Sequence, residues 1–159
     1  MSTVQDQPPQ RERRGSIPFE WKIPDMSQLL RKLTPGKRSL ISKPFYLFGC
    51  GYKYLLKIET VTFGFHAFLS VYIKVVPGEF DESLSWPCKE KVRVELVDQQ
   101  SLPGENKSGV IDFEKGKNLC SRPLRDDDDE YRPILGLRNV DIAEYGSFSK
   151  SILVRVNRV

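Results

Sequence analysis

From residue 38 to the end of the chain, short segments rich in β-branched and aromatic residues alternate with turns that contain glycine or proline. Residues of these types are enriched in strands, and glycine and proline end them. Six segments follow this pattern: SLISKPFYL, YKYLLKIETV, AFLSVYIKVV, KVRVELVDQ, SGVIDF and SILVRVNRV. Because the strands are short and hardly any helix fits between them, the pattern predicts an all-β antiparallel sandwich or barrel.

Strict alternation in KVRVELV indicates how one of these strands is oriented. Side chains alternate between the two faces of a strand, so Val92, Val94 and Leu96 share one face. Arg93 and Glu95 share the other face. We therefore expect one face of the sheet to be buried and the other to be hydrated.

The N-terminal part has a different pattern. Residues 1–16 are polar, without apolar periodicity, and are predicted to be a disordered lead-in. IPFEWKI at 17–23 alternates as a half-buried strand does. One short N-terminal helix is then expected to begin at Asp25 and to end at Thr34-Pro35-Gly36. Its apolar face would consist of Leu29, Leu30 and Leu33.

Length and composition favour one folded domain over residues 17–159. The chain has 159 residues, of which 39% are hydrophobic and 29% charged, as in an ordinary globular domain with one core. Neither a run of about 18 apolar residues nor a secretion signal is seen, so a cytoplasmic location is expected.

The formal net charge of +4 is unevenly distributed. Residues 1–43 contain 9 basic and 4 acidic residues, whereas residues 44–159 contain 16 basic and 17 acidic residues. The predicted folded body is therefore nearly neutral. The basic cluster of Arg11, Arg13 and Arg14 lies in the polar lead-in, where such clusters are usually solvated, so no nucleic-acid partner is predicted.

The cysteine and histidine content argues against a metal site, a cofactor or an active site. Cys50, Cys88 and Cys120 are widely spaced and form no CxxC pair, and His66 is the only histidine. A thiol enzyme that pairs one cysteine with His66 stays an alternative, because catalytic partners meet in space.

Asp126–Asp129 and Glu130 form an acidic run. The run lacks the alternating ligands and central glycine of a calcium loop, so we expect a solvated turn. Docking of a basic partner is the second interpretation.

The most specific motif is LSWPCKEKVRVELVDQ at residues 84–99. It resembles the C-terminal TRAF domain, which belongs to the meprin-and-TRAF homology (MATH) family. That family carries a Trp-Pro step followed by a strand that closes on Leu-x-Asp-Gln, and the matching residues here are Trp86, Pro87, Leu96, Asp98 and Gln99.

Further agreement with this family extends over residues 17–159. It comes from FEWKI at 19–23, Pro44-Phe45-Tyr46, Gly51-Tyr52-Lys53, LSVYIKVVPGEFD at 69–81, Arg122-Pro123 and the closing strand at 151–158.

The resemblance implies an eight-stranded antiparallel β-sandwich that is not an enzyme. It further implies an adaptor in tumour necrosis factor receptor signalling or the ubiquitin pathway, which binds extended peptides of receptor tails or signalling proteins. An incoming peptide can pair with an exposed strand edge while side-chain pockets select its sequence. The alternative is a structural, self-associating sandwich with a degenerate peptide groove.

Transfer of the family's peptide groove gives candidate binding residues on two strands. The family's Arg and Tyr correspond to Lys57 and Glu59, so the positive charge is kept without the planar fork of arginine, and Glu59 is expected to repel an acidic ligand. An acidic family position corresponds to Phe63, and an aromatic position is retained as Tyr72.

A second part of the groove lies before and after Arg122-Pro123. The family's serines correspond to Lys117, Asn118, Leu119 and Cys120, and Tyr131 is a further groove neighbour. Because the hydroxyl groups are replaced, the resemblance implies a changed specificity.

Signalling members of the family trimerise through a coiled coil just upstream of this domain. The first 16 residues cannot form one, so a monomer or weak oligomer is expected. A homotrimer is expected only if a coiled coil is supplied upstream, where it would add avidity.

Overall fold

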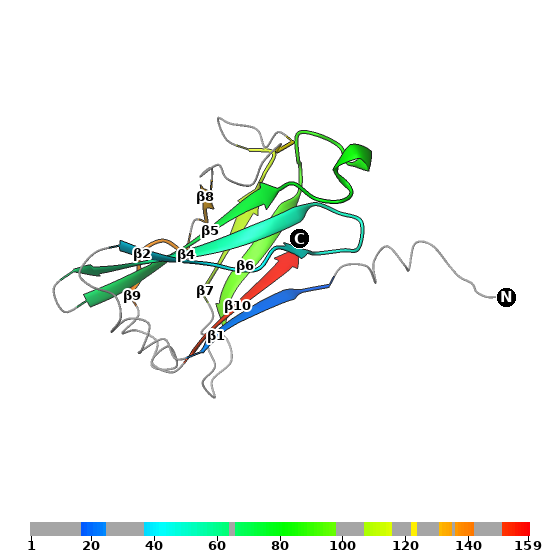
Figure 1. The fold of residues 1–159 in the computed structure, drawn as a ribbon. Coiled ribbons are helices and arrows are strands. Elements are labelled where there is room, and N and C mark those ends of the chain that lie inside the picture. The colour runs from blue at the N-terminus through cyan, green and yellow to red at the C-terminus, as the bar shows by residue number, and fades with distance from the viewer. Residues whose placement is uncertain are drawn as a thin grey trace.

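A computed structural model gives the protein as two antiparallel β-sheets packed face to face (Figure 1). The structure describes residues 17–24, 37–63, 66–97, 107–115, 122–123, 131–134, 136–141 and 151–159. Sheets that are apolar on one face are stabilised by packing those faces together, which here produces a sandwich.

The first sheet has the strand order β1-β10-β6-β7. Its strands are β1 (Phe19–Pro24), β10 (Ser151–Arg158), β6 (Lys91–Val97) and β7 (Lys107–Asp112). Figure 1 shows the C-terminal strand β10 lying beside β1, so the two ends of the domain meet in this sheet.

The second sheet is built on a long hairpin of β4 (Lys53–Phe63) and β5 (His66–Val76). β2 (Lys37–Ile41) and the short β3 (Phe45–Tyr46) pair with β4 on one side of the hairpin. β8 (Arg132–Pro133) and β9 (Val140–Asp141) pair with β5 on the other side.

The core lies between the two sheets. The inward side chains of β6 are fully buried, as its alternation predicted: Val92, Val94 and Leu96. The facing hairpin contributes Tyr54, Leu56, Ile58, Val71 and Ile73, which are also buried. Burial raises the pKa of the Tyr54 phenol, so this side chain acts as a neutral core residue.

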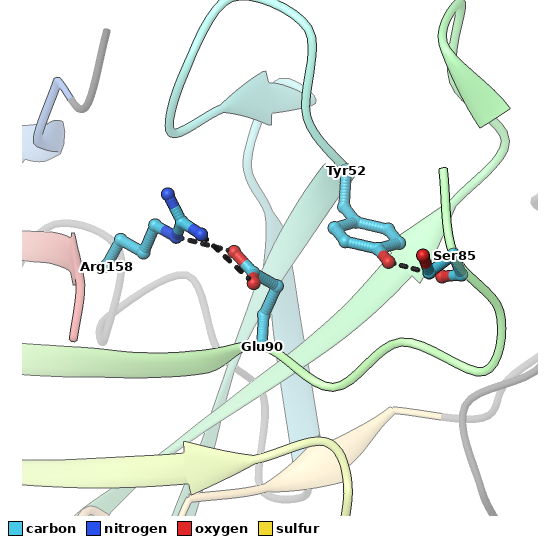
Figure 2. A network of polar contacts seen from close by, with 4 residues as sticks. All are labelled: Tyr52, Ser85, Glu90 and Arg158. Atoms are coloured by element: carbon cyan, nitrogen blue, oxygen red, sulfur yellow. Dashed lines mark hydrogen bonds and ion pairs between the residues drawn. The ribbon is translucent and has the colours of Figure 1, made fainter. Parts of the chain in front are cut away.

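A corner of the sandwich carries the Trp-Pro motif. The Trp86 indole N–H donates to the carbonyl oxygen of Asp81 at 2.8 Å, and the Trp86 ring packs edge-on against Tyr52 at a centroid distance of 5.0 Å. The Tyr52 hydroxyl donates to the carbonyl oxygen of Ser85 (Figure 2). The loop with the Trp-Pro motif is therefore held against Tyr52, the residue just before β4.

An ion pair closes the same end of the molecule (Figure 2). Arg158 Nε lies 2.7 Å from Glu90 Oε1, and the Arg158 guanidinium lies 4.5 Å from the Phe48 ring centroid. This ion pair and cation–π contact tie the end of β10 to the start of β6 and to the β3–β4 connection.

The predicted fold class is confirmed, with one difference in strand number. Ten strands occur in the described residues instead of eight, and three of them, β3, β8 and β9, contain only two residues each. Runs that short leave no periodic pattern. The expected helix at 25–36 and the expected lead-in at 1–16 lie outside the described residues; the helical element that is described is a 3₁₀ turn at Asp81–Ser83.

Candidate functional site

A row of side chains crosses the outer face of the second sheet. Ile41 on β2 is opposite Lys57 on β4, Lys57 is opposite Tyr72 on β5, and Tyr72 is opposite Pro133 on β8. Directly opposed residues of antiparallel strands project from the same face. The row therefore places two of the predicted ligand-facing residues, Lys57 and Tyr72, next to each other.

Lys57 lies between two aromatic rings. Its Nζ atom is 5.1 Å from the ring centroid of Tyr72 and 4.4 Å from that of Tyr131. Both distances are within the range of a cation–π interaction. The structure thus brings Tyr131, a predicted groove neighbour that is 74 positions further along the chain than Lys57, to the predicted site.

Glu59 lies close enough to Lys57 to neutralise it. The Lys57 Nζ to Glu59 Oε2 distance is 3.4 Å, and the two side chains are only 17% and 13% exposed. Residues two positions apart on a strand project from the same face, which makes this pair possible. Glu59 was expected to repel an acidic ligand. The ion pair adds a second effect, because Glu59 already binds the Lys57 ammonium group with which an acidic ligand would pair.

Lys74 is a member of the site that the sequence analysis missed. It is 6% exposed, and its Nζ atom lies 4.6 Å from the Tyr131 ring centroid, on the same aromatic ring that Lys57 contacts. We call Lys57, Glu59, Tyr72, Lys74 and Tyr131 the Lys57 cluster. It contains two ammonium groups, one carboxylate and two phenol rings.

The outer face of β5 around the cluster is largely buried. Ser70 is 8% exposed and Val76 is 3% exposed, although both project away from the core. The Ser70 hydroxyl accepts a hydrogen bond of 2.9 Å from the Asn139 backbone N–H. The sequence held little signal for this burial, because the outward set of LSVYIKVV is Ser70, Tyr72, Lys74 and Val76, which is largely polar.

Five other predicted groove residues are not seen at the Lys57 cluster: one lies away from it, and four lie outside the described residues. Phe63 is opposite His66 at the tip of the β4–β5 hairpin, six positions from Lys57 and thus about 20 Å along the strand. Lys117, Asn118, Leu119 and Cys120 lie outside the described residues. The groove roles of these five residues stay predictions.

The described residues offer little for metal or thiol chemistry. Cys88 is buried in the core and Cys50 is exposed. Within the described ranges no group of three His, Cys, Asp or Glu side chains is arranged to hold a metal ion. In those same ranges, no helix has the length and apolarity needed to cross a membrane.

Comparison with protein families gives a match to the model described as "TRAF/meprin, MATH domain", over residues 37–146. The matched range includes β4, β5, the Trp-Pro corner and all five members of the Lys57 cluster.

Curated relatives are tumour necrosis factor receptor-associated factors. Factor 6 of Danio rerio is 28% identical over 109 residues, which cover 66% of this chain and 20% of the relative. Factor 5 of Mus musculus is 35% identical over 104 residues, covering 64% of this chain and 18% of the relative. This chain thus spans about a fifth of the length of the curated relatives it matches.

A solved structure supports the fold. TRAF5 of Notothenia coriiceps superimposes with a TM-score of 0.64 and 22% sequence identity, covering 94% of this chain and 77% of that chain. At this identity the likeness concerns the sandwich fold.

Proposed function

Because the chain belongs to the TRAF/meprin MATH domain family, we propose that it is a peptide-binding adaptor module that recognises extended peptides of receptors or ubiquitin-pathway partners. MATH domains of the TRAF type are non-catalytic binding modules that bind peptide partners, so the prediction that the chain is not an enzyme is confirmed by its family. The proposed surface is the outer face of β4, β5 and β8.

The observation that carries this proposal is the Lys57 cluster. Ammonium groups and phenol rings on a half-buried surface can hold an acidic or aromatic side chain, because low exposure weakens competition by water. Tyrosine is enriched among residues that dominate binding energy at interfaces. Tyr72 and Tyr131 are therefore the expected anchors, and Lys57 and Lys74 supply positive charge.

The ion pair between Lys57 and Glu59 predicts a selective and weak site. An acidic ligand group must displace Glu59 from Lys57, so part of the interaction energy is spent in separating an existing pair. A single copy of the domain is then expected to bind weakly, and clustering of several copies would raise the apparent affinity.

The names of the relatives suggest the setting. The tumour necrosis factor receptor-associated factors are named for association with receptors, and we extend to this chain a cytoplasmic adaptor role of the same kind. A trimeric coiled coil supplied upstream would give three such sites one orientation.

A peptide-array screen of the purified chain tests the proposal, once alone and once fused to a trimeric coiled coil. Lys57→Ala is expected to reduce the signal of every bound peptide, whereas Arg93→Ala on the opposite sheet is the matched control and is expected to leave it unchanged. Silence of both the single chain and the trimer across the array would contradict the proposal.

Self-association is the second candidate, and one observation favours it. Ile41 and Val61 are 57% and 36% exposed on the outer face of the second sheet, and apolar side chains in such positions are suited to contact another copy. Sedimentation across a range of protein concentrations separates the two functions: a specific oligomer favours self-association, and a monomer favours peptide binding.

A further inference from the structure

One basic motif of the sequence plays no part in the proposed peptide site. In RRGSI at residues 13–17, two arginines stand three and two positions before Ser16, and Ile17 follows the serine directly. Arginine-directed serine/threonine kinases select this pattern. Carboxylates in the substrate groove of such a kinase pair with the two guanidinium groups, and an apolar pocket takes the side chain that follows the serine.

The structure shows that the side chain after the serine can enter such a pocket. Ile17 is 63% exposed, more than any other large hydrophobic side chain that the structure describes. Pro18 is also exposed. Packing begins at Phe19, whose ring stacks on Phe45 with a centroid distance of 4.0 Å. Ile17 can therefore be bound by another protein without being withdrawn from the core.

The backbone at Ile17 is held only lightly by the domain. The Ile17 N–H donates to the Leu47 carbonyl oxygen at 2.7 Å. The ladder between β1 and β10 begins two residues later, where Phe19 is opposite Val156. Chain segments next to the end of a ladder open at low cost. A kinase groove that takes the chain as far as Ile17 therefore leaves the pairing of β1 in place.

Two other hydroxyl groups closely follow a pair of basic residues, and each lacks part of the pattern. Ser39 follows Lys37-Arg38 without a spacer, so the basic residues stand two and one positions before it, and it lies within β2. Thr34 follows Arg31-Lys32 at the same spacing as in the motif, but Pro35 comes next. Proline has no N–H and restricts the backbone of the residue before it.

We propose that Ser16 is a phosphorylation site for an arginine-directed serine/threonine kinase. The Ser16 Oγ atom attacks the γ-phosphorus of ATP, and the bond from that phosphorus to the oxygen that bridges to the β-phosphate breaks. ADP leaves, and the hydroxyl proton passes to a carboxylate of the kinase. The product has about two negative charges and three acceptor oxygens on the residue before Ile17.

The test incubates the purified full chain with MgATP and the catalytic subunit of cyclic-AMP-dependent protein kinase, an arginine-directed enzyme. Tandem mass spectrometry locates the phosphate, and transfer of label from [γ-³²P]ATP gives the rate. One phosphate per chain is expected, on Ser16. Ser16→Ala is expected to remove most of the incorporated label.

Three variants test the pattern itself. Arg13→Ala is expected to lower kcat/KM about tenfold or more, because one charge-assisted contact with the kinase is lost. Arg11→Ala removes the same charge five positions before Ser16, outside the pattern, and is the matched control that is expected to keep the rate unchanged. Ile17→Ala is expected to lower kcat/KM about fivefold, and because this side chain is 63% exposed, the variant keeps the fold.

A synthetic peptide of residues 9–20 shows whether the folded domain leaves the serine accessible. The full chain is expected to be phosphorylated within about tenfold of the rate of this peptide, because only the hydrogen bond between Ile17 and Leu47 has to open. A full chain that reacts more than about a hundredfold more slowly would show that the domain blocks the serine, and would overturn the assignment.

The outcomes are independent of the proposed peptide site. Phosphate on Ser16, with a rate that falls in Arg13→Ala and not in Arg11→Ala, supports the assignment. No phosphate on Ser16, phosphate mainly on Thr34 or Ser39, or equal rates of the two arginine variants overturns it. The kinase assay needs no bound peptide, so silence of the peptide array would contradict the proposed function and leave this assignment standing.

Discussion

The two outer faces of the sandwich differ, although the same alternating pattern of inward apolar residues builds both sheets. On the first sheet the outward residues carry exposed charges that pair across strands, as in the 2.9 Å contact of Arg155 Nε with Glu20 Oε2. On the second sheet the outward residues of β5 are themselves buried, including Lys74 at 6% exposure.

The two outer faces therefore differ in how strongly water screens their charges, and neither face is part of the core. The first sheet presents a hydrated surface in which each ion pair is screened by water. The second sheet holds two lysines against a tyrosine ring on a surface largely removed from water. Electrostatic interactions there are less screened by water, which is why we propose the second face as the one that binds ligand.

The largest expected effect is on the free energy of unfolding, when a carboxylate is placed on each of the two outer faces. Val76→Asp on β5 introduces a carboxylate at a side chain that is 3% exposed, and is expected to destabilise the fold by about 3 kcal/mol or more. Val110→Asp on β7, where the side chain is 43% exposed, is expected to cost less than about 1 kcal/mol. Urea denaturation midpoints measure both; equal shifts would mean that the two faces are equally solvated.

The next effect concerns the aromatic anchor. Tyr72→Ala is expected to weaken peptide binding by about 2 kcal/mol, which is about 30-fold, while the domain stays folded. Arg93→Ala on the first sheet is expected to leave affinity unchanged. Isothermal titration with a peptide selected from the array gives both values, and an unchanged affinity of a folded Tyr72→Ala variant refutes the transferred groove.

A smaller effect on peptide affinity tests the role of the ion pair between Lys57 and Glu59. Glu59→Gln removes the internal partner of Lys57, and is expected to raise the affinity for acidic peptides about fivefold, or about 1 kcal/mol. The gain is expected to shrink as salt is added. Glu20→Gln, which removes a carboxylate on the opposite face, is the control; a loss of affinity in Glu59→Gln would show that Glu59 itself contacts the ligand.

The smallest effect is expected where charges are exposed. The side chains of Arg155 and Glu20 are 36% and 51% exposed, so Glu20→Gln is expected to change the free energy of unfolding by less than about 0.5 kcal/mol. Thermal and urea unfolding provide the measurement. A cost above 1 kcal/mol would mean that the first outer face is held together more tightly than its exposure indicates.

The sequence was informative where periodicity is strong. The alternation of β6 predicted that Val92, Val94 and Leu96 are buried, and the structure confirms this. The segments chosen for β4, β5, β7 and β10 also correspond to observed strands. Long strands leave a pattern because one face must be apolar over many residues.

The shortest strands and two members of the Lys57 cluster could not be identified from local sequence patterns. β8 and β9 contain two residues each, and they are recognisable only through pairing with β5. Tyr131 reaches Lys57 through a contact between distant parts of the chain. Lys74 alternates with Ile73 and Val75 as a solvated residue of a half-buried strand does, so its burial could not be found from the sequence.

The central claim is that the outer face of the second sheet binds peptide and the outer face of the first does not. Backbone amide chemical shifts of the isotope-labelled full chain, followed while an array-selected peptide is added, test this directly. We predict that signals of Ile41, Lys57, Tyr72 and Tyr131 move in proportion to binding, while those of Glu20, Arg93 and Arg155 stay in place. Movement confined to the latter three, or spread equally over both faces, would contradict the account.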